Sequence, residues 1–220
     1  VELLMIAERA LSEPTRVQDM DAMVLAGGAS KRLGSPKALL PLGNTTLVEA
    51  VLARLRPLFR RLLVVARDLE GLTELDATVL VDNRPERGPL VGLTRGLEAS
   101  DAPWCFVVGC DMPFLNPQVI LRMVERLEGC DILAPRVNGH LQPLHAFYGQ
   151  ACLPLARELL DRGNTSPLDL FHRCRVRTIE ASELLDIDPD LLSFRDLDTV
   201  EEYQAALKQV RALQQEGVAP

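Results

Sequence analysis

The sequence lacks the cysteine patterns of disulfide-stapled and zinc-binding folds. Its five cysteines are an odd number, and none of them forms a Cys-x-x-Cys pair. We therefore expect neither a disulfide framework nor a zinc knuckle, and a reducing cytoplasm is the setting that suits such a chain. Cys105 and Cys110 lie five residues apart in an apolar run, so a strand would direct them to opposite faces as packing residues.

Long apolar stretches and an excess of positive charge are missing too. No apolar stretch approaches the roughly 20 residues that a membrane-spanning helix needs. The start of the chain is acidic and is interrupted by Glu8 and Arg9, unlike a secretory signal. Lys and Arg number 24 against 31 Asp and Glu, a formal charge of −7. This balance argues against nucleic acid or an anionic membrane as a partner.

What is present is the composition of an ordinary globular protein. The chain has 220 residues, of which 47% are hydrophobic and 25% are charged. A chain of this length buries roughly 70% of its unfolded surface, so it has a sufficient core without disulfides or a structural metal. We expect one domain at residues 21–215, preceded by an N-terminal extension at residues 1–20 that is helical or frayed.

Short Val-rich runs alternate with segments of helical period from Asp21 onward. This alternation predicts an α/β fold, a single doubly wound and mostly parallel sheet with helices on both faces. The expected strands span residues 22–26, 62–66, 78–81, 104–110, 131–135, 142–148 and 175–180.

Helix starts are marked by capping residues and by proline. The patterns that resemble capping boxes are Thr46-x-x-Glu49, Ser166-Pro167-x-Asp169 and Asp198-x-x-Glu201. Asn116-Pro117 places proline at the first helical position, and a helix at residues 89–100 should follow the break at Gly88. Another helix should begin near Gln150, with Pro154 in an early turn.

A glycine-rich, basic loop follows the first expected strand. It reads LAGGASKRLGSPK, and no acidic residue occurs between Ala22 and Val48. In a chain of charge −7, such a loop at the carboxyl end of a strand is a place where a polyphosphate would bind. Glycine lets backbone N–H groups approach the anion, and the cations neutralise it. The loop contains Gly27, Gly28, Lys31, Arg32, Gly34 and Lys37.

Two familiar phosphate-binding loops do not fit this spacing. A Walker A loop has four residues between its glycines and a lysine directly after the second one. Here Gly28 and Gly34 are separated by five residues, and Lys37 comes three positions later. The dinucleotide fingerprint G-x-G-x-x-G is absent. The remaining alternative to a phosphate site is a flexible turn with solvated lysines.

An aspartate follows the apolar run WCFVVGC in the segment VVGCDMPF. Asp111 should lie just beyond a central strand, at the edge where ligands of α/β sheets bind. Its carboxylate is therefore placed to hold Mg²⁺ against the phosphates. The simpler alternative is an aspartate that only supports a turn or caps a helix.

Five motifs in order carry a resemblance to a known family. They are LAGGASKRLGSPKALLPLG, GPLVG, GCDMPF, LQPLHAFY and FRDLDTVEEY. In this order they resemble the molybdenum cofactor guanylyltransferases over about residues 21–207. The first motif alone is shared by many nucleotidyltransferases, so the specificity lies in the whole set.

The resemblance implies a Rossmann-like nucleotidyltransferase that joins GMP from Mg·GTP to molybdopterin, with or without molybdenum, and releases pyrophosphate. In such an enzyme Lys37 contacts the phosphates, Arg32 steadies the leaving pyrophosphate, Asp82 contacts the nucleoside and Asp111 binds the metal. The nucleotide is also held by Leu25, Ala26, Gly27 and Gly28.

The implied cofactor is Mg²⁺, with Mn²⁺ as an alternative. GTP and molybdopterin would be substrates, and delivery or acceptor proteins of the same pathway are candidate partners. We expect neither nucleic acid nor a membrane as a partner. A monomer is compatible with the sequence, which leaves the oligomeric state open.

Two segments depart from the family pattern. Ala66-Arg67-Asp68 stands where many relatives carry Asn-x-Asn or Ser-x-Asn, so the nucleoside contact there is unassigned. Near the C-terminus, Asp196-Leu197-Asp198-Thr199-Val200 replaces a frequent Asn-x-Asn-Thr-Pro. Asp198 has two interpretations, a second metal-side ligand or the N-cap of the last helix.

The histidines do not form a metal-binding pattern. His140 and His145 bracket a segment that resembles the pterin-side wall of the family, but a structural histidine is the favoured interpretation of His145. His172 lies beside Arg173, Arg175 and Arg177, a run typical of a solvated edge.

The sequence is compatible with three functions. Leu-Ala-Gly-Gly at Leu25 resembles the guanine-type loop, whereas cytidylyl-transferring relatives read Ala-Ala-Gly. The leading hypothesis is therefore GMP transfer to molybdopterin. The alternatives are transfer by a CTP-dependent enzyme or onto another small phosphate, and a regulator that binds nucleotide without turnover.

Overall fold

A central sheet organises the protein, whose computed structural model describes residues 17–27 and 36–215. Strand β1 is parallel to β4 and β6, β4 is parallel to β5, and β7 is parallel to β10. Only β8 and β9 run against their neighbours in this sheet, so the predicted mostly parallel α/β fold is confirmed. In spatial order the strands are β10 (Val176–Glu180), β7 (Ile132–Val137), β9 (His145–Gly149), β6 (Trp104–Gly109), β1 (Asp21–Leu25), β4 (Arg61–Ala66) and β5 (Thr78–Val81), with β8 (His140–Leu141) on β7.

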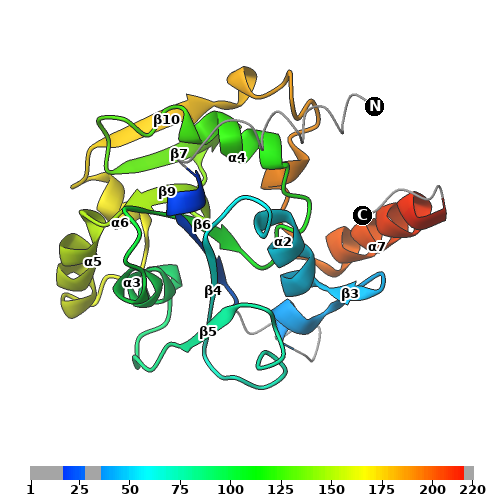
Figure 1. Ribbon diagram of the computed structural model, residues 1–220, viewed down its shortest axis with the longest axis horizontal. Coiled ribbons are helices and arrows are strands. Elements are labelled where there is room, and N and C mark those ends of the chain that lie inside the picture. Colours follow the sequence, from blue (N-terminus) through cyan, green and yellow to red (C-terminus); the bar gives the residue numbers. More distant parts are fainter. Residues whose placement is uncertain (1–16, 28–35, 216–220) are drawn as a thin grey trace.

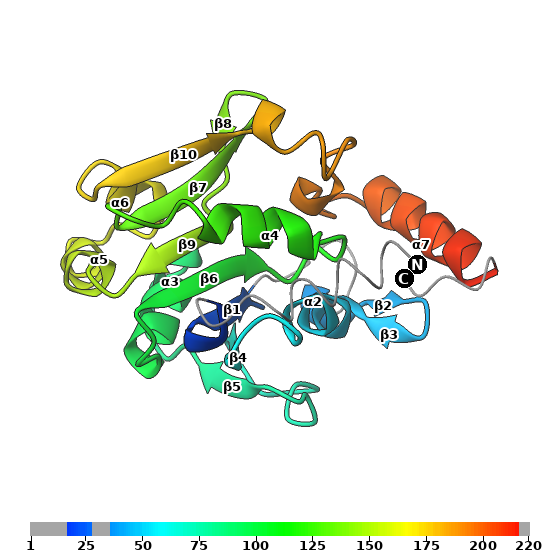
Figure 2. The same cartoon turned by 45° about the horizontal axis from the view of Figure 1, so that its top comes forward.

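Helices cover both faces of the sheet (Figures 1 and 2). α2 (Leu47–Leu55) and α4 (Pro117–Val124) pack into the apolar cluster of one face. α3 (Pro89–Ala99), α5 (Cys152–Asp161) and the single turn α6 (Leu168–Phe171) pack into the cluster of the other. The described residues also form short 3₁₀ turns, which are η1 (Val17–Asp19), η2 (Lys37–Leu39), η3 (Ala181–Glu183) and η4 (Leu192–Phe194).

The last helix lies on a small hairpin beyond the sheet. α7 (Val200–Gln215) stands beside the hairpin of β2 (Pro41–Leu42) and β3 (Thr45–Thr46) in Figure 2. The Tyr203 hydroxyl donates to the Pro41 carbonyl oxygen at 2.5 Å. A separate apolar cluster holds the two together, formed by Leu40, Leu42, Leu47, Leu197, Ala206 and Val210.

Two of the predicted helix starts are confirmed in atomic detail. The Thr46 side chain accepts from the Glu49 N–H, and the Glu49 carboxylate accepts from the Thr46 N–H, a complete capping box. Asn116 caps α4 by accepting from the Gln118 N–H, with proline at the first position. The helices expected after Gly88 and near Gln150 are α3 and α5.

Two other capping predictions are wrong. The box of α7 is formed one residue later than predicted, by Thr199 and Glu202, because the Asp198 carboxylate is drawn into an ion pair elsewhere. At α6 the Ser166 hydroxyl accepts from the Leu168 N–H, but Asp169 closes no box and the helix ends after one turn.

The expected strand at residues 142–148 begins later, at His145. Gln142 and His145 are joined by a turn, in which the His145 N–H donates to the Gln142 carbonyl oxygen at 3.2 Å. Proline at position 143 has no N–H to donate to a strand ladder, which fits its place in this turn.

Cys105 and Cys110 are packing residues, as predicted. Cys105 and Cys110 lie in the clusters of opposite sheet faces, and all five cysteines are free thiols. Within the described ranges, none of the helices has the length and hydrophobicity needed to cross a bilayer.

Candidate active site

The carboxyl ends of four parallel strands meet at one edge of the sheet. Leu25 at the end of β1 pairs with Val65 of β4 and with Gly109 of β6. β5 continues the same edge, because Val81 pairs with Ala66. Residues that directly follow these strands are therefore brought together, and such an edge is the usual ligand site of an open α/β sheet.

Lys37 joins two carboxylates at this edge. Its Nζ lies 2.8 Å from Asp111 Oδ2 and 2.5 Å from Asp198 Oδ1, and its side chain is only 12% exposed. Burial lowers the pKa of Lys37, but the hydrogen bonds to Asp111 and Asp198 outweigh this effect and raise it above the ordinary value. The predicted meeting of Lys37 and Asp111 at one site is confirmed.

The contact with Lys37 argues against the helix-cap interpretation of Asp198. Asp198 does not cap α7 with its side chain, and its carboxylate instead lies against Lys37. The backbone fixes this arrangement, since the Leu197 N–H donates to the Asp111 carbonyl oxygen at 3.1 Å. The segment before α7 is thus tied directly to the loop that carries Asp111.

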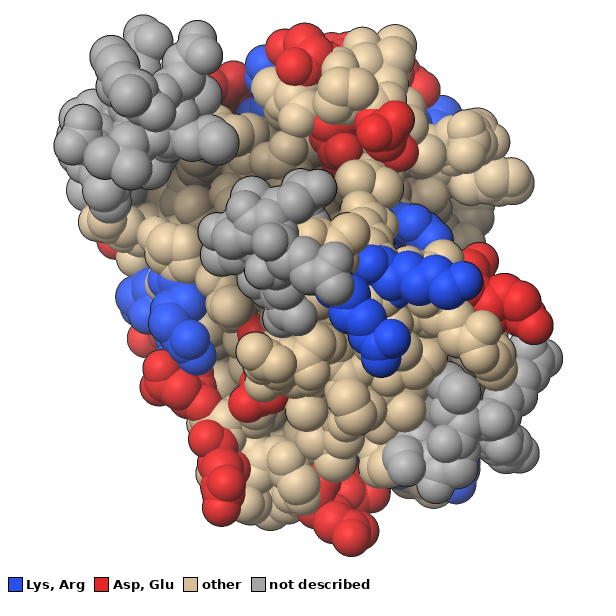
Figure 3. All heavy atoms as spheres, turned by 90° about the vertical axis from the view of Figure 1, so that its right-hand side faces the viewer, with Lys and Arg blue, Asp and Glu red and all other residues tan. Residues whose placement is uncertain are grey.

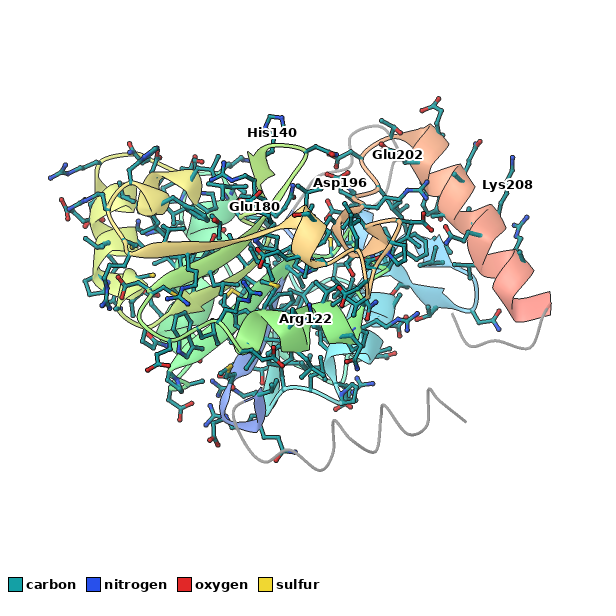
Figure 4. The ribbon with its side chains drawn as sticks, turned by 90° about the horizontal axis from the view of Figure 1, so that it is seen from above. Arg122, His140, Glu180, Asp196, Glu202 and Lys208 are labelled. Carbon is teal, nitrogen blue, oxygen red and sulfur yellow. The ribbon has the colours of Figure 1, made fainter. Side chains whose placement is uncertain are left out.

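A third aspartate was not assigned by the sequence. Asp196 lies on the segment that leads into α7, with Glu202 in the first turn of that helix (Figure 4). Partial burial, followed by the negative charges of Asp198 and Asp111, raises the pKa of Asp196. Negative charge is therefore concentrated around Lys37. The alternating pattern Asp196-Leu197-Asp198 is the feature of the sequence that indicates this concentration.

Gly109 allows the Asp111 side chain its position. A Cβ atom at Gly109 would lie 2.3 Å from Asp111 Oδ1, closer than non-bonded atoms approach. The Met112 N–H donates back to the Gly109 carbonyl oxygen at 3.4 Å and closes a tight turn around Asp111. Any side chain at position 109 must displace the carboxylate.

A second group of residues surrounds Asp82, at the end of β5. The Asp82 N–H donates to the Ala66 carbonyl oxygen at 2.8 Å, and Asp82 Oδ1 accepts from the Arg84 N–H at 3.1 Å. Arg67 Nε lies 3.6 Å from Asp82 Oδ2. A pocket of about 210 Å³ adjoins this group, lined by Val81, Asp82, Asn83, Arg84, Val91, Thr94, Arg95 and Glu98.

Part of the predicted nucleotide loop can be placed. The Ala26 N–H donates to the Val65 carbonyl oxygen, and the Leu25 carbonyl oxygen accepts from the Cys110 N–H. These two backbone groups are bonded within the sheet. A Cβ atom at Gly27 would have no atom of the described residues within 4 Å. Gly28 and Arg32 lie outside the described residues.

Charge is unevenly distributed over the molecule. On the face seen in Figure 3, Lys and Arg side chains gather in two groups, and Asp and Glu lie mostly around the margin. The net charge of −7 therefore does not describe every part of the surface.

His145 is a structural residue, as favoured by the sequence. Its ring is fully buried and packs 5.2 Å from the Phe106 ring and 4.5 Å from the Phe194 ring. Burial lowers its pKa to about 3, so the imidazole is neutral near pH 7. His140 and His172 are exposed.

One known family model matches more than half of the chain. Residues 22–176 match the MobA-like NTP transferase domain. The chain belongs to this family. It is therefore a nucleotidyltransferase, and the enzyme class and fold predicted from the sequence are confirmed.

Individual relatives of this MobA-like transferase cover most of its length. It is 32% identical over 177 residues to a probable molybdenum cofactor guanylyltransferase of Pelotomaculum thermopropionicum, covering 80% of this chain and 86% of the relative. It is 31% identical over 198 residues to a molybdenum cofactor guanylyltransferase of Desulfosudis oleivorans, covering 88% and 98%. The crystal structure of molybdopterin-guanine dinucleotide biosynthesis protein A from Archaeoglobus fulgidus superposes with a TM-score of 0.77 at 26% identity, covering 88% and 100%.

Proposed function

We propose that this MobA-like transferase moves GMP from Mg·GTP to the terminal phosphate of molybdopterin and releases pyrophosphate. The observation that carries the proposal is the contact of Lys37 with Asp111 and Asp198 at the carboxyl edge of the sheet. The names of the two relatives support guanylyl transfer to the molybdenum cofactor, and the name of the Archaeoglobus fulgidus protein supports molybdopterin as the acceptor. The acceptor is taken with or without molybdenum.

The residues at the site fit a hard divalent cation. Mg²⁺ is usually held by one or two carboxylates together with substrate phosphates, not by an all-protein cage. No group of three His, Cys, Asp or Glu side chains suited to a metal occurs among the described residues, but Asp111 and Asp198 supply two carboxylates that already share one cation, the Lys37 ammonium. We propose these two as the ligands of Mg²⁺, with Mn²⁺ as a substitute. When bound, the metal would supply positive charge against the phosphates.

The protein's own task is alignment and charge neutralisation. The terminal phosphate of molybdopterin is already an anion, so it needs no protein base to attack the α-phosphorus in line. Lys37, which lies between Asp111 and Asp198, would contact the phosphates of the nucleotide. Arg32, outside the described residues, would steady the leaving pyrophosphate. Holding two anions in register can contribute ~7 to 11 kcal/mol to lowering the barrier.

Asp82 is the proposed contact for the nucleoside. Its carboxylate is only 10% exposed and adjoins the pocket between β5 and α3. Asp82 Oδ1 is held by the Arg84 N–H, whereas Oδ2 lies 3.6 Å from Arg67, longer than a hydrogen bond. Acceptor capacity therefore remains on Asp82 for donors of a ribose or base.

The decisive experiment is product analysis. The purified protein is incubated with molybdopterin and Mg·GTP, and in parallel with Mg·CTP, and the dinucleotide is identified by mass. We expect the guanine dinucleotide and pyrophosphate. A cytosine product would replace the proposal by the CTP-dependent alternative, and binding of GTP without any transfer would favour a regulator.

The cellular setting follows from the same proposal. A cytoplasmic enzyme has access to GTP and keeps its free cysteines reduced. Proteins that deliver molybdopterin or accept the dinucleotide are the proposed partners, and co-purification with tagged protein is the measurement that identifies them.

A further inference from the structure

Arg67 binds one loop through all parts of its guanidinium group. Its Nη1 donates to the Arg84 carbonyl oxygen at 2.6 Å, and its Nη2 donates to the Glu86 carbonyl oxygen. Its Nε faces the Asp82 carboxylate at 3.6 Å. One side chain at the end of β4 therefore touches three residues of the segment 82–87, which connects β5 to α3.

The contacts of Arg67 amount to more than an exposed ion pair. An isolated surface salt bridge contributes little, because water screens it and the side chains lose freedom. Arg67 instead satisfies two backbone carbonyl groups, and its planar fork can reach both at once, which a lysine ammonium cannot do. Its side chain is 35% exposed, so about two thirds of its surface is covered by the protein.

The ends of the segment are fixed by other contacts. At its start, the Asp82 N–H donates to the Ala66 carbonyl oxygen. At its end, Gly88 has φ +153°, and a Cβ atom there would lie 2.5 Å from Thr165 Cβ. Between these anchors, Arg67 holds the carbonyl groups at positions 84 and 86. These contacts lie beside Asp82, Asn83 and Arg84, which form one wall of the pocket.

We propose that Arg67 is a positioning residue for the nucleoside half of the site. It holds Asp82 and the segment 83–87 in the shape that receives the nucleoside, without occupying the acceptor capacity of Asp82. This inference rests on the proposed function, since it assigns the pocket beside Asp82 to the nucleotide. It predicts that loss of Arg67 weakens nucleotide binding and leaves the phosphate chemistry at Lys37 and Asp111 intact.

The test compares Arg67→Ala and Arg67→Lys with a matched control. For Arg67→Ala we expect the KM for Mg·GTP to rise about tenfold, the scale of one charge-assisted hydrogen bond, while kcat changes less than about twofold. Millimolar guanidinium should restore part of the KM, which a general loss of packing would not allow. Arg67→Lys should show an intermediate KM. Arg56→Ala is the control, because Arg56 is also an exposed arginine bound to a loop, through Asp76.

A second measurement is independent of the reaction. Hydrogen exchange at the amides of residues 83–87 should accelerate most in Arg67→Ala, to a smaller but measurable extent in Arg67→Lys, and not at all in Arg56→Ala. Unchanged exchange in this segment overturns the positioning role, whether or not the wild type transfers GMP. If exchange accelerates as expected but the wild type transfers no GMP, only the proposed function has failed. Loss of kcat at unchanged KM, without guanidinium rescue, also overturns it. If Arg67→Ala does not fold, the same two readouts on Arg67→Lys decide.

Discussion

Lys37 and Asp111 are 74 positions apart in the sequence, and their side chains meet at 2.8 Å. Asp198, 161 positions from Lys37, reaches the same ammonium group. One cation thus holds together two carboxylates that would otherwise repel each other. The proposed metal binding by Asp111 and Asp198 and the proposed phosphate contact of Lys37 both depend on this arrangement.

Removal of the Lys37 charge should reduce catalysis far more than stability. For Lys37→Met we expect kcat to fall about 100-fold, the scale of removing one preorganised charged donor from a transition state. With Mg²⁺ present the melting temperature should change little, because the metal can replace the ammonium as the cation between Asp111 and Asp198, whereas without Mg²⁺ the two carboxylates repel each other and the melting temperature should fall. Steady-state kinetics and thermal unfolding measure the two effects. Lys208→Met, on an exposed part of α7, is the matched control, and equal losses in both variants would contradict the assignment.

Gly109→Ala should act through Asp111. The added methyl group would lie 2.3 Å from Asp111 Oδ1, so the carboxylate must move. We expect transfer to fall by at least about tenfold while the protein stays folded. A double variant with Asp111→Asn distinguishes this mechanism from general strain, because the glycine change should then add almost nothing to the loss of activity. Additive losses would contradict it.

Asp198 and Thr199 are neighbours with separate tasks. Thr199→Ala removes the cap of α7 and should lower the free energy of unfolding by about 1 kcal/mol with little effect on kcat. Asp198→Asn should weaken activation by Mg²⁺ and leave unfolding nearly unchanged. Denaturant titration and Mg²⁺ dependence of the rate are the measurements. The reverse pattern would return Asp198 to the role of a helix cap.

His145 should make the protein less stable as the pH falls. Burial holds its folded pKa near 3, below the value of about 6.5 of an unfolded histidine, so only the unfolded chain takes up a proton between these values. Its contribution to stability is present above about pH 6.5 and is lost towards pH 3. Between pH 7 and pH 5 the loss should be about 2 kcal/mol. Urea unfolding of the wild type and of His145→Leu measures it: a difference that does not depend on pH would contradict the buried neutral state.

Local patterns were sufficient for much of the fold. β5 spans the predicted residues 78–81, and the caps at Thr46 and Asn116 were predicted because their partners lie two or three residues away. The cap of α7 was placed one residue early, since both Asp198 and Thr199 suit an N-cap by type. Only the distant Lys37 determines which of them is free to do so.

The sequence by itself determined the residue chemistry of this protein: a glycine-rich basic loop, an aspartate after a central strand and apolar runs of the right period. These features depend on short-range sterics and on the spacing of apolar residues, and both can be read directly from the sequence. The tertiary structure alone decided that Asp198 contacts Lys37 beside Asp111. It also decided that Arg67 donates hydrogen bonds to the segment 82–87, and that His145 is buried against Phe106 and Phe194. Such contacts arise where strands and loops distant in sequence pack side by side, so no local pattern records them.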